Sequence, residues 1–303
     1  VKMGVEEIVF VVGHLQDTVE AWITEEYPDL TGHYVVQEVQ DGTAGAIALA
    51  EPFVDEDLLV IFADAVLEVD YSVTATLGQE YDALIWAKEV EDYQRFGVIV
   101  TDDDGIMTHI VEKPSEPIST LANIGLYYVR DHELFFEGVR HTLASEPSVG
   151  GEYYLTDAFQ YMVDQGARLL PTPVEGWWDA GKPETLLETN GHLLETGRGG
   201  TEGATITDAE IVEPVRIEAG CVVRGGTIGP NVTLEAGCVV ENSTLRDTVV
   251  GPEARLRGVR LHDSIVGGHA QLSDVQGVLL VTDHSVVTGE GRPERADRRG
   301  LAG

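Results

Sequence analysis

The stretch "LLVIFADAVLEVDY", residues 58–71, indicates the fold class of the first part of the chain. Its apolar run from Leu58 to Phe62 is typical of a strand buried on both faces, as in a parallel sheet covered by helices. A carboxylate, Asp64, follows one small residue later. Ligands of open α/β sheets bind beyond the carboxyl ends of strands, where a carboxylate is costly unless a cation or hydrogen bonds compensate it. Asp64 is therefore a candidate metal ligand; the alternative is that it only caps the turn before the next strand.

The composition excludes several classes of protein. The 303 residues include 53 acidic and 19 basic ones, for a formal net charge of −34. Such a charge argues against a nucleic-acid partner or an anionic membrane surface. No apolar run reaches the roughly 20 residues of a membrane helix, and no basic-then-apolar leader opens the sequence. We therefore expect a soluble, cytoplasmic protein that does not bind membranes.

Lysine is scarce, and acidic residues dominate the charged positions. Four lysines are present, Lys2, Lys88, Lys113 and Lys182, and the other basic residues are arginines. An acid-rich, lysine-poor surface favours solubility in concentrated salt, because salt screens its self-repulsion. We therefore expect a salt-loving source.

The chain changes character near the Gly-rich segment "ETGRGGTEGA", residues 195–204. Before it, predicted strands alternate with helices, and "GVIVTDDDGIMTHIVEKP" (97–114) predicts a hairpin around an Asp-Asp-Asp-Gly turn. This pattern predicts a Rossmann-like α/β domain over 1–194, with a mixed, mostly parallel sheet and helices on both faces. We expect 195–204 to be a linker.

After the linker, aliphatic residues recur every five or six positions, which neither a helix nor a flat strand explains. The pattern predicts a parallel β-helix over 205–288, with aliphatic residues inside and Gly, Asn or Asp at the corners, and a flexible tail at 289–303. The inward residues are expected to be Ile206, Ile211, Ile217, Val223, Ile228, Leu234, Val240, Leu245, Val250, Leu256, Leu261, Val266 and Leu272.

Two segments of this half, "IEAGCVV" and "LEAGCVV", recur seventeen residues apart, about one coil of three sides. Cys221 and Cys238 therefore stack on neighbouring coils, where we interpret them as inert small hydrophobes rather than a bond or reactive thiols. The ends of such a stack are usually capped or paired, so we expect the β-helix to assemble a homo-oligomer.

The order of motifs resembles the sugar-1-phosphate nucleotidylyltransferases, particularly the long archaeal type similar to glucose-1-phosphate thymidylyltransferase, with a left-handed β-helix of hexapeptide repeats. The resemblance covers almost the whole chain. Its motifs are "VQEVQDGTAGA" (36–46), "FADAVLE" (62–68), "FGVIV" (96–100), "EKP" (112–114), "ANIGLYY" (122–128), "GEYYLTD" (151–157), "WWDAGKPETLLETN" (177–190) and the repeats.

The resemblance implies a role for each matching residue. Gln37 would read the edge of the nucleotide base, and Gly42 and Thr43 would let the backbone approach base and ribose. Asp64 and Asp179 would both bind Mg²⁺. The sugar-phosphate ligands would be Gly97 through its backbone, Glu112 accepting from sugar hydroxyls, Lys113 on the phosphate, and Asn123 and Glu152 lining the pocket.

The implied chemistry is attack by a sugar-1-phosphate on the α-phosphorus of a nucleoside triphosphate, most directly glucose-1-phosphate and dTTP, releasing pyrophosphate. Positioning and charge neutralisation dominate such transfers. Plainer readings stay open: Lys113 as a solvated hairpin end, Glu112 as its ion-pair partner, and Trp177 and Trp178 as packing residues. An acetyl-transfer base at His262 or His269 is a further alternative.

The family's Gly-rich loop with Thr-Arg and a later Pro-Lys is missing from the N-terminal part of this sequence. We therefore expect a truncated chain of low or no activity, with an unpaired internal edge in its sheet. The alternative is a non-catalytic subunit that binds nucleotide-sugars and scaffolds a complete enzyme. An in-frame "GxGTR"-like stretch in the DNA immediately upstream would favour truncation.

Overall fold

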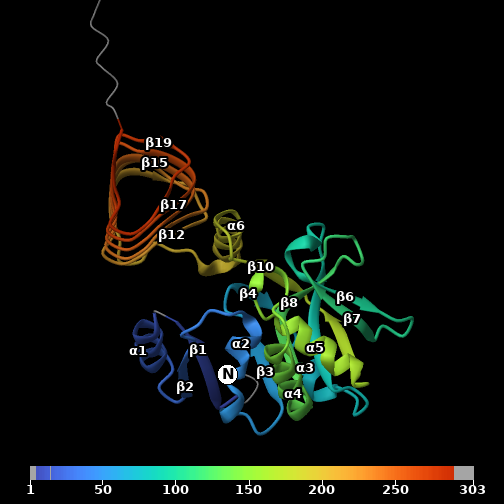
Figure 1. Ribbon diagram of the computed structural model, residues 1–303. Helices are drawn as coiled ribbons and strands as arrows, with labels where there is room; N and C mark the ends of the chain where they lie inside the picture. The colour runs from blue at the N-terminus through green and yellow to red at the C-terminus, as the bar shows by residue number, and fades with distance from the viewer. Residues whose placement is uncertain (1–4, 14, 290–303) are drawn as a thin grey trace, which may run out of the picture. The chain divides into compact units, whose positions relative to one another are not determined.

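The computed structural model describes residues 5–13 and 15–289, and the chain divides into two compact units (Figure 1). The first unit comprises residues 1–63 and 67–177, and the second comprises 64–66 and 178–303. The division falls before helix α6 (Pro183–Leu193), upstream of the segment expected to be a linker. Apart from Gly289, the expected tail at 289–303 lies outside the described residues.

The first unit alternates strands with helices, as the sequence predicts. Its strands are β1 (Glu7–Val12), β2 (Thr31–Val36), β3 (Leu58–Ile61), β5 (Ala83–Glu89), β6 (Gly97–Thr101), β7 (Met107–Glu112), β8 (Leu121–Val129) and β9 (Leu169–Pro173). Its α-helices are α1 (Gln16–Glu26), α2 (Thr43–Ala48), α3 (Ser72–Thr76), α4 (His132–Ala144) and α5 (Leu155–Asp164), with short 3₁₀ turns η1 (Glu51–Phe53), η2 (Tyr93–Arg95) and η3 (Val149–Gly151). Strands β4 (Ala65–Glu68) and β10 (Gly176–Asp179) pair with each other in a separate two-stranded sheet.

The main sheet is mixed, which confirms the predicted class. Its order is β7-β6-β8-β5-β9, with β3 added on β8. The predicted hairpin is the antiparallel pair β6–β7. The sheet was expected to be mostly parallel, but most of its strand pairs are antiparallel. Strand β8 runs antiparallel to β3, β5 and β6, and within this sheet of the described residues only the β5–β9 pair is parallel.

Helices cover both faces of this sheet. Alternate residues of β5 enter different clusters, because successive side chains of a strand point to opposite faces. Ala83, Ile85 and Ala87 join the side chains of α4 and α5 in one cluster. Leu84 and Trp86 join residues around α3 in the other. The core therefore lies on both sides of β5 and β8.

The opening stretch forms β3 as expected, but it is less buried than its composition implies. Only Val60 is buried, and Ile61 is 49% exposed. The reason is that, among the strands of residues 5–13 and 15–289, β3 pairs with β8 alone and β1 pairs only with β2 in a separate parallel sheet. Within the described residues, β1 and β3 each present one edge without a strand partner.

The second unit contains a parallel β-helix and the helix that precedes it. Helix α6 (Pro183–Leu193) continues into a single π-helical turn, η4 (Leu194–Arg198). The strands are β11 (Thr205–Ile211), β12 (Val215–Ile217), β13 (Val222–Ile228), β14 (Val232–Leu234), β15 (Val239–Val250), β16 (Arg255–Arg257), β17 (Arg260–Val266), β18 (Gln271–Ser273), β19 (Gln276–Gly277), β20 (Leu280–Val281) and β21 (Val286–Thr288). Figure 1 shows them stacked as successive coils.

The register of these strands confirms the predicted repeat. Val222 pairs with Val239, so one coil returns after seventeen residues. All thirteen expected inward residues belong to the interior cluster of the β-helix. Non-glycine residues with positive φ mark the corners, and most are Asp, Asn or His, which tolerate that conformation best. They are Asp208, Asn231, Asn242, Asp247, Glu253, Asp263, His269, Asp274 and His284.

Cys221 and Cys238 stack on neighbouring coils as free, buried thiols, as expected. The Cys221 Sγ lies 3.0 Å from the Glu235 carbonyl oxygen, and the Cys238 Sγ lies 3.1 Å from that of Gly251. No helix in the described part of the chain is both long and apolar enough to cross a membrane.

Candidate active site

Gly97, the first residue of β6, stands at the centre of a polar cluster in the first unit. A Cβ at this position would lie 2.4 Å from Asn123 Nδ2, 2.6 Å from Thr156 Cγ2 and 2.9 Å from Glu112 Oε2. Glycine is therefore required by packing here, although its φ is ordinary. Three expected sugar ligands, Gly97, Glu112 and Asn123, are brought together from three different strands.

The Glu112 carboxylate is largely buried at the end of β7, opposite Gly97 in the hairpin. The Thr156 hydroxyl donates to its Oε2 at 3.2 Å. Burial raises the pKa of Glu112 above its usual value, because the charged form loses solvation, and the Lys113 charge offsets only part of this. This carboxylate is a strong acceptor with few protein donors around it.

Lys113 occupies a strained position directly after β7, with φ of 45°. Its backbone N–H donates to the Phe96 carbonyl oxygen at 3.0 Å. Its Nζ lies 3.0 Å from Tyr154 Oη, 4.5 Å from the centre of that ring, and 3.9 Å from Glu112 Oε1. Partial burial lowers the pKa of Lys113, but the bond to Tyr154 and the charges of Glu112 and Glu152 raise it more.

The surroundings of Lys113 bear on the alternatives raised by the sequence. Its ammonium contacts both the Tyr154 hydroxyl and the Glu112 carboxylate. The side chain remains 39% exposed, so a ligand can reach it. A cation with ordered neighbours and an accessible tip suits an anion such as a phosphate.

Asn123, on β8, is buried with its amide orientation fixed. Its Nδ2 donates to the Gly97 carbonyl oxygen at 2.9 Å, and its Oδ1 accepts from the Tyr127 hydroxyl. Burial raises the pKa of Tyr127, so this hydroxyl stays protonated and donates. Glu152 is exposed, and its charge acts on both Glu112 and Lys113.

Three residues that contact this cluster were not assigned from the sequence: Tyr127, Tyr154 and Thr156. Tyr154 and Thr156 lie within the motif "GEYYLTD", and Tyr127 within "ANIGLYY". The signal was present, because each lies two or four residues from an assigned ligand. Their contacts depend on how α5 packs against β7, which sequence spacing does not show.

The expected nucleotide loop, residues 37–43, docks on the backbone that leads into α5. Gly42 has φ of 121°, and a Cβ there would lie 2.4 Å from the Tyr153 carbonyl oxygen, so only glycine fits. The Thr43 hydroxyl accepts from the Leu155 N–H at 2.9 Å and so caps α5. Gln37 Nε2 lies 3.1 Å from both Asp41 Oδ1 and the Gly42 carbonyl oxygen. The loop is thereby joined to the segment that carries Tyr154 and Thr156.

Asp64 and Asp179 come together in the second unit, although they are far apart in sequence. The Ala180 N–H donates to the Asp64 carbonyl oxygen at 2.8 Å. A Cβ at Gly181 would lie 3.1 Å from Asp179 Oδ1 and 3.7 Å from Asp64 Oδ2, so both carboxylates border one small space. Within the described residues, no group of three or more His, Cys, Asp or Glu side chains could hold a metal.

This pair of carboxylates fits Mg²⁺ rather than zinc. Magnesium is commonly held by one or two carboxylates and takes its other ligands from water and substrate phosphates. A closed structural zinc site needs four protein ligands of the Cys and His type. The sequence expectation of two carboxylate oxygens near one ion is therefore compatible with the geometry.

The two tryptophans of "WWDAG" pack as the plainer reading of the sequence predicted. The Trp177 ring lies edge-to-face on Phe96, with centroids 5.2 Å apart. The Trp178 ring stacks on His192, with centroids 3.5 Å apart and an angle of 11°. Trp177 therefore supports Phe96, the residue before Gly97. Trp178 is itself the residue before Asp179, and its stacking on His192 supports that position.

Comparison with known proteins identifies the family of the chain. Residues 1–196 match the family described as nucleotidyl transferase. The low-salt glycan biosynthesis nucleotidyltransferase Agl11 of Haloferax volcanii is 34% identical over 289 residues, covering 90% of this chain and 77% of that protein. A glucose-1-phosphate thymidylyltransferase of Streptomyces griseus is 29% identical over 311 residues, covering 93% of this chain and 86% of that one.

A solved structure shares the fold. The crystal structure of UDP-glucose pyrophosphorylase complexed with UDP-glucose superposes with a TM-score of 0.56 at 22% identity, covering 63% of this chain and 81% of that one. The class of the protein follows from these matches: it is a nucleotidyltransferase of nucleotide-sugar biosynthesis. The chain belongs to the nucleotidyl transferase family, among the sugar-1-phosphate nucleotidyltransferases that carry a C-terminal β-helix.

Proposed function

We propose that the chain transfers the nucleotidyl group of dTTP to glucose-1-phosphate, forming a nucleotide-sugar and pyrophosphate. The observation that carries the proposal is the cluster around Gly97, where a buried carboxylate and an accessible ammonium lie 3.9 Å apart. A sugar phosphate needs both: an acceptor for its hydroxyls and a cation for its phosphate. The thymidylyltransferase of Streptomyces griseus supports the choice of base and sugar.

The sugar would lie against the Gly97 backbone, with Glu112 accepting from its hydroxyls. Asn123 fixes the Gly97 carbonyl through a 2.9 Å bond, and Glu152 would border the open side. The buried Glu112 carboxylate has lost hydrogen bonds to water, and a sugar hydroxyl that donates to it replaces them. A ligand without that hydroxyl would leave the carboxylate unpaired, so the contact selects for the sugar. Lys113 would hold the phosphate as a point charge.

The base and ribose would lie on the loop that contains Gly42 and Thr43. The side-chain nitrogen of Gln37, Nε2, donates hydrogen bonds to Asp41 and Gly42 within this loop. We assign the side-chain oxygen of Gln37, Oε1, to recognition of the base. A carbonyl acceptor can pair with the N3–H that thymine and uracil share. This feature therefore favours a pyrimidine of that type without distinguishing the two.

Asp64 and Asp179 would hold Mg²⁺, which supplies charge neutralisation on the triphosphate when it is bound. The reacting oxygen of the sugar phosphate attacks the α-phosphorus, a new P–O bond forms, and the bond to the pyrophosphate oxygen breaks. No protein nucleophile takes part. Lys113 orients the attacking phosphate and disperses its charge, which is how such transfers are mostly catalysed.

Pyrophosphate release tests the proposal. The chain is assayed in molar KCl with Mg²⁺, glucose-1-phosphate and each nucleoside triphosphate in turn, beside Asp64→Asn and Asp179→Asn variants. We expect release that is fastest with dTTP and is lost in both variants and in EDTA. Equal rates with UTP would overturn the choice of base.

Absence of release with every nucleotide would leave a truncated enzyme and a scaffolding subunit both standing. The same assay on a chain extended by its upstream codons then separates that subunit from a truncated enzyme. We further propose that the protein acts in the cytoplasm as a homo-oligomer joined through the β-helix. Light scattering in molar KCl gives the mass that tests this assembly.

A further inference from the structure

We propose that the β-helix positions Asp179 through helix α6, with Asn190 as the residue that connects them. The inference rests on the proposed function, in which Asp179 is a metal ligand. It adds a positioning role for residues that would never touch substrate or metal. Helix α6, Asp179 and the β-helix all belong to the second unit.

One face of α6 holds the Asp179 loop. The Thr185 hydroxyl lies 3.3 Å from Asp179 Oδ2, and the buried Thr189 hydroxyl lies 2.9 Å from the Asp179 carbonyl oxygen. His192 stacks on Trp178, the residue before Asp179. Positions 185, 189 and 192 are four and three residues apart, so they share one face of the helix. The carboxylate, its backbone and its neighbour are thus all held by α6.

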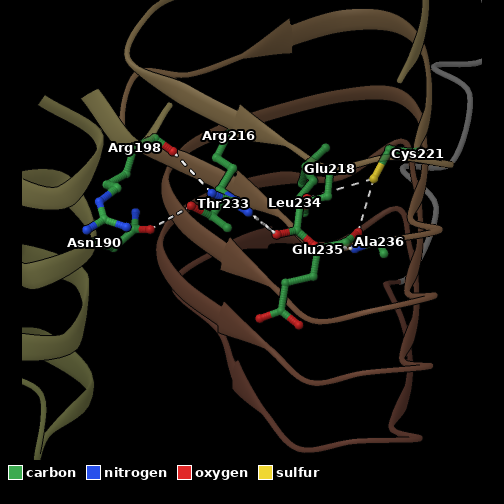
Figure 2. Close-up of polar contacts among 9 residues, drawn as sticks. All are labelled: Asn190, Arg198, Arg216, Glu218, Cys221, Thr233, Leu234, Glu235 and Ala236. Atoms are coloured by element: carbon green, nitrogen blue, oxygen red, sulfur yellow. Dashed lines mark hydrogen bonds and ion pairs between the residues drawn. The ribbon is translucent and has the colours of Figure 1, made fainter. Parts of the chain in front are cut away.

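The adjacent face of α6 is attached to the β-helix by Asn190, as Figure 2 shows. The Asn190 Oδ1 accepts from the Thr233 hydroxyl at 2.6 Å, and its Nδ2 donates to the Asn231 carbonyl oxygen at 3.3 Å. Both ends of the amide are therefore used. Asn231 is itself fixed, since its side chain donates to Asp247 Oδ1 at 2.8 Å on the next coil.

A second attachment lies where the helical segment ends (Figure 2). Arg216, on β12, donates to the Arg198 carbonyl oxygen at 3.4 Å and pairs with Glu218. Glu218 Oε2 in turn accepts from the Ala236 N–H at 3.1 Å, on the following coil. The helical segment is thus held at Asn190 and at Arg198, and it cannot rotate or slide without breaking one of these contacts.

The series of hydrogen bonds from the β-helix to Asp179 is short and continuous. Asn190 directly follows Thr189, so the bond from the β-helix and the bond to Asp179 act on consecutive residues of a rigid helix. Residues that orient metal ligands commonly change metal affinity or activity by roughly 10- to 100-fold when they are replaced. Loss of the Asn190 contacts should therefore weaken metal binding while sparing the sugar pocket, whose residues belong to the first unit.

The test compares Asn190→Ala, Thr233→Val and their double variant, with Thr244→Val as the matched control on an exposed position of β15. Mn²⁺ binding is measured by electron paramagnetic resonance in molar KCl, which suppresses ions held only by net charge. Binding of glucose-1-phosphate by calorimetry and the thermal midpoint are measured in parallel.

We expect Asn190→Ala and Thr233→Val each to weaken Mn²⁺ binding by roughly tenfold. The double variant should be no worse than the stronger single one, because both remove the same bond. Glucose-1-phosphate binding should stay within about twofold. Unchanged Mn²⁺ binding in both single variants, or equal weakening by Thr244→Val, would overturn the positioning role.

Asp179→Asn separates this inference from the proposed function. If Asp179→Asn leaves Mn²⁺ binding unchanged, the metal assignment itself fails. If Asp179→Asn removes binding while Asn190→Ala and Thr233→Val do not affect it, the metal assignment stands and the role of the β-helix is refuted. Should Asn190→Ala fail to fold, Thr233→Val removes the same bond from the other side and decides the matter.

Discussion

Gly97 and Glu112 face each other across the β6–β7 hairpin so closely that a Cβ at residue 97 would lie 2.9 Å from the Glu112 carboxylate. Asn123 and Thr156 close the other sides of the same space. The backbone of Gly97 and the side chain of Glu112 therefore present one surface to a ligand. The absence of a side chain at residue 97 is what allows a buried carboxylate to lie beside the backbone.

Gly97→Ala should disrupt this surface. The added methyl group displaces Asn123 and Glu112, and overpacking of this kind costs about 1–3 kcal/mol of stability. We expect the free energy of unfolding to fall by that amount and glucose-1-phosphate binding to be lost. Gly105→Ala is the control, because a Cβ at residue 105 would have no atom within 4 Å. This variant should be destabilised only by the smaller cost of an alanine at positive φ, and it should still bind glucose-1-phosphate. Normal binding by Gly97→Ala would contradict the pocket.

Lys113→Met should weaken sugar-phosphate binding specifically. A hydrogen bond to a charged group contributes about 1.5–3 kcal/mol, so we expect the Kd for glucose-1-phosphate to rise roughly 10- to 100-fold. Binding of free glucose, which lacks the phosphate, should not change. Lys88→Met removes another of the four lysines and serves as the control. Equal effects of the two variants in calorimetry would assign the loss to general charge rather than to Lys113.

The buried carboxylate predicts a pH-dependent difference in stability. Burial raises the pKa of Glu112 above its usual value of 4.5. The protonated Glu112 side chain therefore contributes fully to the free energy of unfolding below about pH 4.5, and this contribution is lost as the pH rises through the raised pKa. Glu112→Gln cannot ionise, so it should gain stability relative to the parent chain across this range. Denaturant unfolding of both chains in molar KCl, from about pH 4 to about pH 8, measures the difference. A difference that stays constant would show that the pKa is not raised.

The stacked cysteines should be chemically silent in the folded protein. Burial raises the pKa of Cys238 to about 12, and it also raises that of Cys221, so neither forms thiolate at neutral pH. A disulfide reagent such as dithionitrobenzoate should label no thiol in the native chain and both thiols after unfolding. Rapid labelling of the native chain would contradict an inert pair.

Salt should stabilise the protein. The net charge of −34 makes the folded chain repel itself, and salt screens that repulsion, with a Debye length of about 3 Å at 1 M. We expect the thermal midpoint to rise as KCl increases to molar concentration. Sodium sulfate matched in ionic strength separates screening from ion-specific effects. A midpoint that stays flat or falls would rule out the salt-loving source.

The pattern of residues along the chain is enough to predict the helices, the strands and the repeat of the β-helix. The thirteen aliphatic positions of the β-helix all point inward, because a period of five to six residues fits no other regular structure. The residues predicted for the sugar pocket each belong to a short motif whose order along the chain is informative, and their roles stay a prediction. The same reading missed the weak burial of β3, because a strand's composition does not reveal how many partners it has.

Contacts between side chains that are distant in sequence become visible only in the folded structure. Thr156 contacts Glu112, and Tyr154 contacts Lys113, because α5 packs against β7 from more than forty residues away. Asp64 meets Asp179 because two distant segments converge near Gly181. The link from Thr233 through Asn190 to Asp179 has no local signature at all. Sequence patterns record periodicity and local conformation, whereas contacts between distant segments depend on packing that forms only when the whole chain has folded.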